Sequence, residues 1–330
     1  MRLAFSHKGQ VNVAELAKIE SISNEFIARD VPVYAKDMAL EEAQKIPGLR
    51  AVFGESYPNP VRVVALEYSV DEMAADLTNP RWRSTSVEFC GGTHVQRTGE
   101  IGHLIVTEES GIAKGVRRIV AVTGDEAATV TRTADEAAAR LDAMAQVTDD
   151  AEKDAQLKAF SVELARMDMS VVRKDELKTR FAKVRKELDT RLKARAAADV
   201  KAAQEAVTQF FAENPEAPVY IAKLPVGVNA KALQSGVAAA KKLNKPVYLF
   251  AHDAHAAKGK ALFSNYVPSA VLERGLDAVK WNQAVSEKLQ GRGGGKPDGA
   301  QGQGEATPAD VEEALQLAQS FFDMTLGGRS

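Results

Sequence analysis

The longest uninterrupted pattern in the chain is helical. Neither glycine nor proline, the strongest breakers of regular structure, occurs between Gly124 and Pro215. Within this stretch, apolar side chains recur at spacings of four, three, four and four, which keeps them on one helical face. They are Leu177, Phe181, Val184, Leu188 and Leu192. We therefore predict a helical connector over residues 125–214.

Charge is distributed unevenly along this connector. From Asp125 to Asp154, acidic residues outnumber basic ones by nine to three, and from Arg173 to Lys201 basic residues outnumber acidic ones by eleven to five. An antiparallel helical hairpin or coiled coil would fold the acidic arm onto the basic arm. The alternative is two charged faces that are solvated separately.

On the N-terminal side of the connector, short β-like runs alternate with turn residues, an α+β pattern. The runs predict strands at residues 31–34, 51–53, 61–66, 102–107 and 117–122. Helices are expected near residues 12–28 and 40–45. We assign residues 1–124 to one domain.

On the C-terminal side, the order of the runs is βαββα, which suggests a small α/β domain over residues 215–330. The predicted elements are strands at 219–224, 247–251 and 261–267 and helices at 230–243 and 271–289. Residues 291–304 contain seven of the 23 glycines and predict a loop. Thr307 and Pro308 then have the residue types of an N-cap and a first helical position. The expected fold class is α+β with several domains.

Composition narrows the classes of function. The chain has 330 residues, with 43 Lys and Arg against 45 Asp and Glu, so it is not a globally basic nucleic-acid binder and any such surface must be regional. A single cysteine excludes an intramolecular disulfide and CxxC zinc ribbons. No apolar run is long enough for a membrane span, and the first thirty residues are unlike a targeting peptide. These features predict a soluble intracellular protein without a membrane partner.

The sharpest local signal is the sequence Cys90-Gly91-Gly92-Thr93-His94. Two glycines would let the backbone bend enough for a thiolate and an imidazole to reach the same zinc ion. Two ligands do not complete a zinc site, so the others would have to come from elsewhere in the fold. The alternative is a buried cysteine in a turn.

Several segments, in order along nearly the whole chain, resemble the alanyl-tRNA synthetase family. CGGTHV at 90–95 and GIAKGVRRIVAVTG at 111–124 resemble the second half of its editing domain, as do LAFSHKG at 3–9, PVYAKD at 32–37 and GLRAVFGESYPNPVRVV at 48–64. GRGGGKPDGAQGQG at 291–304, after WNQAVSEKL at 281–289, is similar to the glycine-rich signature of its C-terminal domain. The amino-acid sequence at 32–64 and 111–124 resembles the eukaryotic branch of this family more than the bacterial one.

This resemblance implies an editing site that removes serine or glycine from wrongly charged tRNA(Ala), at a zinc ion held by an HxxxH pair and a Cys-x3-His pair. Cys90 and His94 match the second pair, and no H-x3-H occurs in the sequence, so we expect that element upstream of residue 1. Half a ligand set predicts weak zinc binding and little or no deacylation. The other histidines match no ligand. We expect His252 and His255 on a surface loop and His7 in a structural role; His103 could approach the site.

The resemblance also indicates a tRNA partner. Lys114, Arg117 and Arg118 flank a turn and could contact acceptor-stem phosphates, unless they are simply solvated charges. Arg292 and Lys296 could approach the tRNA backbone, because the glycines between them let the main chain come close. Those glycines are Gly293, Gly294 and Gly295. The alternative for this segment is a flexible linker.

Nothing in the sequence matches the aminoacylation core of the family, so ATP and Mg²⁺ are expected only in a full-length enzyme. The first hypothesis is therefore the C-terminal part of a longer synthetase, with tRNA binding and an incomplete editing site. The alternatives are a freestanding deacylase that edits in trans, or a structural module that forms a homodimer through the connector or the C-terminal domain. We expect a cytoplasmic location, or a mitochondrial one if the true N-terminus lies upstream.

Overall fold

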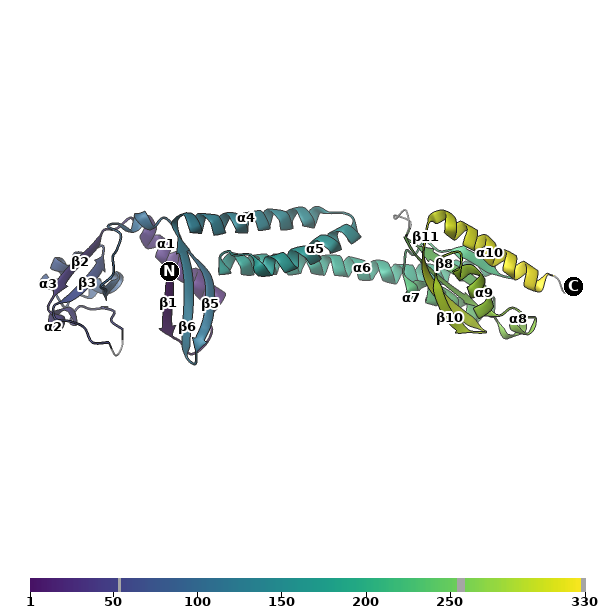
Figure 1. Cartoon of the computed structure of the whole chain (residues 1–330), viewed down its shortest axis with the longest axis horizontal. Helices are drawn as coiled ribbons and strands as arrows, with labels where there is room; N and C mark the ends of the chain where they lie inside the picture. The colour runs from purple at the N-terminus through teal and green to yellow at the C-terminus, as the bar shows by residue number, and fades with distance from the viewer. Residues whose placement is uncertain (53–54, 254–258, 328–330) are drawn as a thin grey trace. The chain divides into compact units, whose positions relative to one another are not determined.

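The computed structural model describes residues 1–52, 55–253 and 259–327, and the chain divides into two compact units (Figure 1). The first unit is Met1–Lys186 and the second is Glu187–Ser330. The division falls within helix α6 (Val171–Glu213). The helical connector therefore contributes residues to both units.

The first unit begins with an antiparallel sheet in the order β1-β6-β5. Its strands are β1 (Arg2–Ser6), β5 (Leu104–Ala113) and β6 (Val116–Thr123). Helix α1 (Val13–Ala28) packs against it, with Leu16 in the same apolar core as Val106 and Ile119. A capping box fixes the start of this helix, because Asn12 and Glu15 each accept a hydrogen bond from the other's backbone N–H.

A second antiparallel sheet, in the order β2-β3-β4, has its own core. Its strands are β2 (Val33–Met38), β3 (Val61–Leu66) and β4 (Val87–Phe89). The short helices beside it are α2 (Leu40–Ala43), α3 (Val70–Ala75) and the 3₁₀ helix η1 (Pro80–Ser84), and η2 (Thr98–Ile101) precedes β5. The predicted strand at 51–53 is wrong for residues 51 and 52, which have no regular structure, and residue 53 lies outside the described residues.

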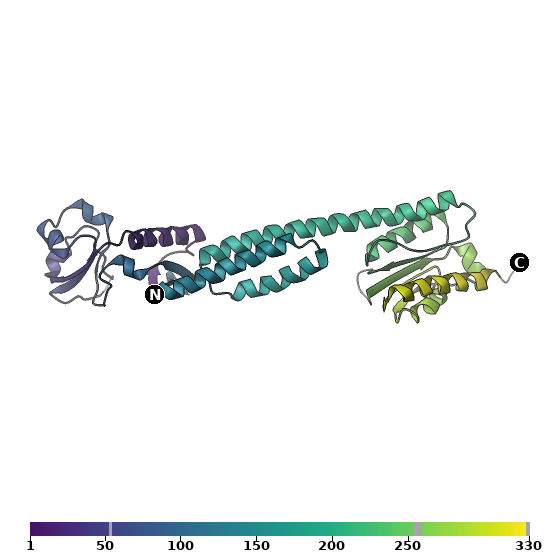
Figure 2. The same cartoon turned by 90° about the horizontal axis from the view of Figure 1, so that it is seen from above.

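The first part of the connector is a group of three helices, α4 (Gly124–Gln146), α5 (Asp150–Arg166) and the start of α6 (Figure 2). The predicted pairing of the acidic arm with the basic arm is confirmed by ion pairs of helix α6 with α4 and α5. They are Arg173 with Asp135, Arg180 with Asp142, and Arg185 with Asp154.

The direction of the predicted pairing is only half right. Both ion pairs between α4 and α6 join residues 38 positions apart, so these two helices run parallel. Helix α5 reverses the chain between them, and Arg140 of α4 contacts Glu163 near the end of α5. The prediction considered two arms, whereas the turn after α4 divides the acidic arm between two helices.

The second unit contains a five-stranded sheet in the order β10-β11-β9-β8-β7, in which β7 and β8 are parallel and the other neighbours antiparallel. The strands are β7 (Tyr220–Lys223), β8 (Val247–His252), β9 (Gly259–Tyr266), β10 (Arg292–Lys296) and β11 (Gly299–Ala306). Helix α7 (Ala230–Leu243) packs on one face of this sheet, and α9 (Ala278–Ser286) and α10 (Pro308–Leu326) pack on the other.

The predicted order βαββα is confirmed, with the last helix divided into α8 (Ser269–Glu273) and α9. Thr307 caps α10 and Pro308 is its first residue, also as predicted. The expected loop at 291–304 is wrong, because strands β10 and β11 form a hairpin over most of these residues. Glycine gives no alternation of polar and apolar side chains, so the strand pattern is invisible in the sequence.

Candidate functional site

The end of strand β4 brings Cys90 and His94 together. The Sγ atom of Cys90 lies 3.2 Å from Nε2 of His94. Glu88, two residues before Cys90, completes a group whose ligand atoms all lie within 4.8 Å of one another. Cys90 and Glu88 are half-buried, and His94 is exposed.

An arginine of the neighbouring strand holds this turn. The Nη1 atom of Arg62, on β3, donates to the carbonyl oxygens of Cys90 and Gly92, each at 2.7 Å. The backbone N–H of Cys90 in turn donates to the carbonyl of Arg62 at 3.3 Å. Because a charged donor makes strong hydrogen bonds, Arg62 fixes the backbone that places the thiol.

Glu88 was missed by the sequence prediction. The signal was present, since residues two apart on a strand point to the same face of the sheet. An extended backbone from β4 to Cys90 therefore places Glu88 and Cys90 on one side of the sheet.

The two glycines of the turn leave its surface open. Neither has a left-handed backbone conformation, so the turn does not depend on backbone angles that only glycine adopts easily. A Cβ atom at Gly91 would meet nothing within 4 Å, and one at Gly92 would meet only the Cys90 Sγ at 3.6 Å. Both residues are exposed. A ligand could therefore approach the thiol and the imidazole across them.

The donor set suits zinc. Thiolate, imidazole and carboxylate are its usual ligands in proteins, and bond lengths of about 2.0 to 2.3 Å place ligand atoms of a tetrahedral site about 3.5 Å apart. The distance between Cys90 and His94 is close to this value. Three protein donors with one open position is the arrangement of catalytic zinc sites. Among the described residues, these three are the one such cluster.

The other histidines that the structure describes lie outside this cluster. His252 is buried at the end of β8, where its Nε2 lies 2.9 Å from the Ala306 carbonyl oxygen, so the expected surface position is wrong. The strand continues one residue beyond its predicted end and takes His252 with it. His255 lies outside the described residues. His7 is exposed and its Nδ1 lies 2.7 Å from the Gly9 carbonyl oxygen; His103 is exposed in the loop before β5.

The three basic residues near the β5–β6 turn differ in their surroundings. Lys114 is exposed in the turn and Arg118 is half-buried on β6. Arg117 makes a two-bond ion pair with Glu109, from Nε at 2.5 Å and Nη2 at 2.6 Å. This pairing lowers the pKa of Glu109, whose side chain is only 3% exposed. The charge of Arg117 is therefore largely compensated within the protein.

A second candidate surface lies on the hairpin of the second unit. A pocket of about 490 Å³ separates the start of α7 from the outer face of β10 and β11. Polar side chains line it: Gln234, Ser264, Arg292, Gln301 and Gln303. Arg292 and Lys296 are exposed, and within the part of the chain that the structure describes their side chains have no ion pair. Such residues suit a polyanion.

The glycines of the β10–β11 hairpin lie on both faces of the sheet and have different surroundings on each. On the inner face, added Cβ atoms would lie 2.4 Å from Asn282 at Gly293, 2.3 Å from the Gly299 carbonyl oxygen at Gly295, and 2.3 Å from the ring of Phe263 at Gly302. Gly294, on the face that lines the pocket, would meet nothing within 4 Å. Most of these glycines therefore allow close packing, and only Gly294 leaves the outer surface open.

Three family models match the chain: the threonyl and alanyl tRNA synthetase second additional domain at residues 61–120, the alanine–tRNA ligase domain at 127–191 and the DHHA1 domain at 216–324. The alanine–tRNA ligase of Schizosaccharomyces pombe is 40% identical over 98% of this chain, and the mitochondrial alanine–tRNA ligase of Saccharomyces cerevisiae is 39% identical over 98%. Both alignments cover 33% of the relative, so the chain spans about one third of the length of the curated relatives it matches.

The similar proteins include both cytoplasmic and mitochondrial ligases. The cytoplasmic alanine–tRNA ligase of Drosophila melanogaster is 34% identical over 99% of this chain, and the alignment covers 34% of that relative. Among solved structures, the C-Ala domain of Aquifex aeolicus alanyl-tRNA synthetase covers 33% of this chain and 89% of its own, with 23% identity and a TM-score of 0.25. Within the described residues, no helix has the length and apolar character that crossing a membrane requires.

Proposed function

Since the chain belongs to the alanine–tRNA ligase family and corresponds to its C-terminal part, we propose that it binds tRNA(Ala) and that its Cys90 site belongs to the hydrolysis of wrongly charged tRNA(Ala). The observation that supports the second part is the approach of the Cys90 thiol and the His94 imidazole to 3.2 Å in an exposed turn. The proposed substrates are seryl- and glycyl-tRNA(Ala).

In this proposal, Cys90, His94 and Glu88 hold a zinc ion. Bound zinc would supply a Lewis acid for the ester that joins the amino acid to the tRNA. Arg62 fixes the turn through the carbonyl oxygens of Cys90 and Gly92. The exposed glycines of the turn give the 3′ end of the tRNA room to approach.

Glu88 changes the expected strength of this site. The Cys-x3-His pair alone predicts weak zinc binding, whereas a third donor brings this chain's own ligands to the number usual in catalytic sites. We therefore propose that the chain binds one zinc ion by itself. Glu88→Gln keeps the size of the side chain and removes the anionic oxygen, so it should weaken zinc binding about 10-fold or more.

The test combines zinc content with hydrolysis of seryl-tRNA(Ala). We expect about one zinc ion per chain by elemental analysis, and loss of zinc in Cys90→Ser and His94→Ala. Any deacylation by the chain should disappear in the same two variants. Zinc that persists in both variants would refute this site, and deacylation unaffected by them would refute its part in editing.

The tRNA proposal rests on a different region, so it is tested separately. Binding of a tRNA(Ala) transcript is measured by gel shift between about 50 and 200 mM salt, where phosphate contacts weaken steeply. We expect binding at the low end and a linear fall of log affinity with log salt. Absence of binding at the lowest salt concentration would contradict the proposal.

A further inference from the structure

The chain passes twice between the two sheets of the first unit, and the two crossings bond to each other. Residues 29–32 lead from α1 to β2, and residues 90–103 lead from β4 to β5. The N–H of Val33 donates to the Gln96 carbonyl at 2.8 Å, and the N–H of Thr98 donates to the Val31 carbonyl at 2.9 Å. Cys90 and His94 both lie on the second crossing.

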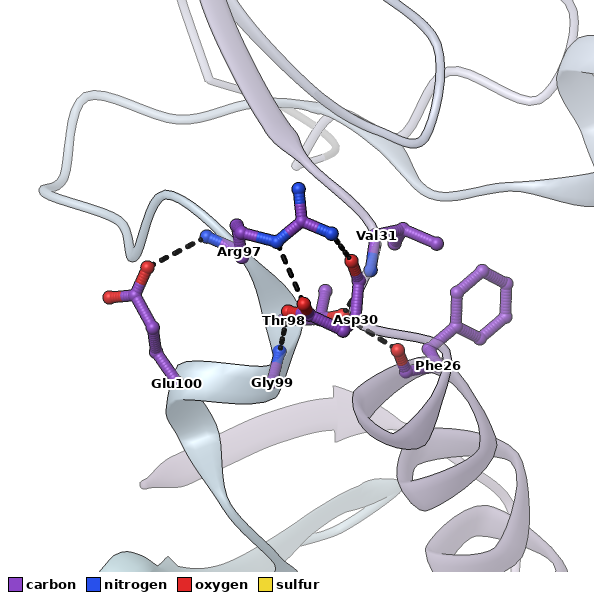
Figure 3. Close-up of polar contacts among 7 residues, drawn as sticks. All are labelled: Phe26, Asp30, Val31, Arg97, Thr98, Gly99 and Glu100. Atoms are coloured by element: carbon purple, nitrogen blue, oxygen red, sulfur yellow. Dashed lines mark hydrogen bonds and ion pairs between the residues drawn. The ribbon is translucent and has the colours of Figure 1, made fainter.

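Side chains reinforce this joint around Asp30 (Figure 3). Arg97 donates from Nε to Oδ2 of Asp30 at 2.8 Å and from Nη2 to its carbonyl oxygen. The Gly99 N–H donates to Oδ1 of Asp30 at 3.1 Å. We name these three residues, together with Thr98, the Asp30 clasp.

Thr98 completes the clasp from within. Its hydroxyl donates to the Phe26 carbonyl at 2.6 Å and accepts from the Val31 N–H at 2.9 Å. The side chain is thus bonded to the last turn of α1 and to the first crossing, and the residue is buried. A buried hydroxyl with both bonds satisfied holds its neighbours in one arrangement.

Two backbone features show that the residues of the Asp30 clasp are closely packed. Asp30 has a φ of 49°, a left-handed conformation that costs energy in a residue other than glycine. A Cβ atom at position 99 would lie 2.5 Å from Oδ1 of Asp30, so the carboxylate can approach the backbone only because residue 99 is glycine.

Cys90 and His94 are therefore held by different means. Strand pairing and Arg62 hold Cys90. His94 lies outside any strand, and among the described residues Cys90 is the partner recorded for its ring. The nearest fixed backbone after His94 is the bonded segment 96–99.

We propose that the Asp30 clasp positions His94 against Cys90. The clasp residues touch neither the thiol nor the imidazole, so they are positioning residues. The part of this inference that concerns a metal rests on the proposed function, whereas the placement of His94 does not.

The first experiment measures Co²⁺ binding by visible absorption, because a thiolate ligand and the coordination geometry both give characteristic bands. Asp30→Gly removes the carboxylate while keeping the left-handed backbone favourable. Gly99→Ala forces the carboxylate away without changing charge. Both variants should bind Co²⁺ about 10- to 100-fold more weakly and with altered bands, as expected when groups that orient a ligand are lost.

The matched control is Lys36→Ala, which breaks the exposed ion pair between Lys36 and Asp71 in the same unit but touches no clasp residue. Circular dichroism and thermal unfolding identify any variant that has lost its fold. Folded Asp30→Gly and Gly99→Ala proteins that bind Co²⁺ as tightly as the wild type, with unchanged bands, would overturn the inference.

The second experiment needs no metal. Cys90 is the one cysteine in the sequence, so its alkylation by iodoacetamide at pH 7 reports a single thiol. An imidazole at hydrogen-bonding distance changes thiol reactivity. The rate in His94→Ala defines the effect of losing this contact, and the two clasp variants should shift the rate in the same direction.

The two experiments distinguish the two possible failures. If the wild type binds no Co²⁺, the proposed metal site fails, and the alkylation rates still test the clasp. If alkylation in the clasp variants matches the wild type while His94→Ala differs, the clasp does not position His94 and the inference fails alone. Wild-type rates in all of these variants would overturn it as well, because His94 would then not act on the thiol.

Discussion

The Cys90 turn and the β10–β11 hairpin both combine glycine with arginine, but they use the two residues in opposite ways. In the turn, Arg62 is bonded to the backbone and the glycines are exposed to open space. In the hairpin, most of the glycines are packed against backbone or aromatic atoms and Arg292 is exposed. A glycine-rich motif can thus be open for a ligand or closed for packing.

This contrast has a physical origin. A buried glycine contributes to stability because, without a side chain, it lets neighbouring atoms pack closely against it. An exposed glycine can instead contribute to binding, because it leaves the surface accessible to a ligand. Likewise, an arginine with two bonded carbonyl groups is part of the scaffold, and a free arginine is available to a polyanion. Four substitutions test these assignments.

The largest effect is expected for Gly304→Ala. The new Cβ would lie 2.2 Å from the Leu289 carbonyl oxygen and 2.9 Å from the Gly291 Cα, and backbone atoms cannot move aside easily. The free energy of unfolding of the second unit should fall by about 3 kcal/mol, measured by urea denaturation. Gly294→Ala is the matched control and should change it by less than about 0.5 kcal/mol. Equal effects would remove the distinction between the two hairpin faces.

The next effect is expected for Arg117→Ala, which leaves the Glu109 carboxylate nearly buried without its ion-pair partner. We expect the free energy of unfolding at pH 7 to fall, by less than in Gly304→Ala. Arg117 lowers the folded-state pKa of Glu109 below its ordinary value of 4.5, so the stabilisation is present above that pH and is lost as the pH falls through the folded-state pKa. Denaturation of both proteins at pH 7 and pH 3 should show the difference shrinking in acid. A pH-independent difference would contradict this role.

A smaller effect is expected for Arg62→Ala. The substitution removes the bonds to two carbonyl groups of the turn while strand β3 keeps its backbone pairing. Zinc affinity should fall about 10-fold, measured by competition with a chromophoric chelator. The control is Arg50→Ala, an arginine whose side chain makes no recorded bond to the turn in the described residues. Unchanged zinc affinity in Arg62→Ala would show that the turn keeps its conformation without the Arg62 hydrogen bonds.

The smallest effect is expected for Arg292→Ala. Losing one phosphate contact should reduce the slope of log affinity against log salt by about 1 and weaken tRNA(Ala) binding only several-fold. Unfolding should be unaffected because the side chain is exposed. Arg117→Ala offers the comparison within the chain, since its charge is already paired and its salt slope should stay near that of the wild type. A larger change of the salt slope in Arg117→Ala than in Arg292→Ala would contradict the assignment of Arg292 as the arginine that contacts tRNA.

Much of the fold follows from local sequence signals. The helix expected from about residue 12 and the helix start marked by Thr307 and Pro308 are both present in the structure. The opposite charges of the connector predict the ion pairs of α6, because attraction between unlike charges depends little on the exact path of the chain. The parallel direction of α4 and α6 could not be predicted in the same way, since it depends on where the turn between α4 and α5 falls.

The candidate site is only partly visible in the sequence. The Cys90 and His94 pairing could be predicted from spacing, but the roles of Arg62 and Asp30 depend on strands and crossings that are distant in the chain. Sequence also gave no sign that Arg117 is neutralised by Glu109 or that His252 is buried, because both depend on which segment becomes the neighbour. Contacts between distant segments are set by packing rather than by local propensity.

The two faces of the β10–β11 hairpin also bear on how this region can evolve. The glycines on its inner face, at 293, 295, 302 and 304, accept no side chain without displacing neighbouring atoms, so the fold restricts the residues at these positions. The outer positions, 292, 294, 301 and 303, border a pocket and can vary without disturbing the core. Selection could therefore change what the hairpin binds while the domain keeps the same architecture.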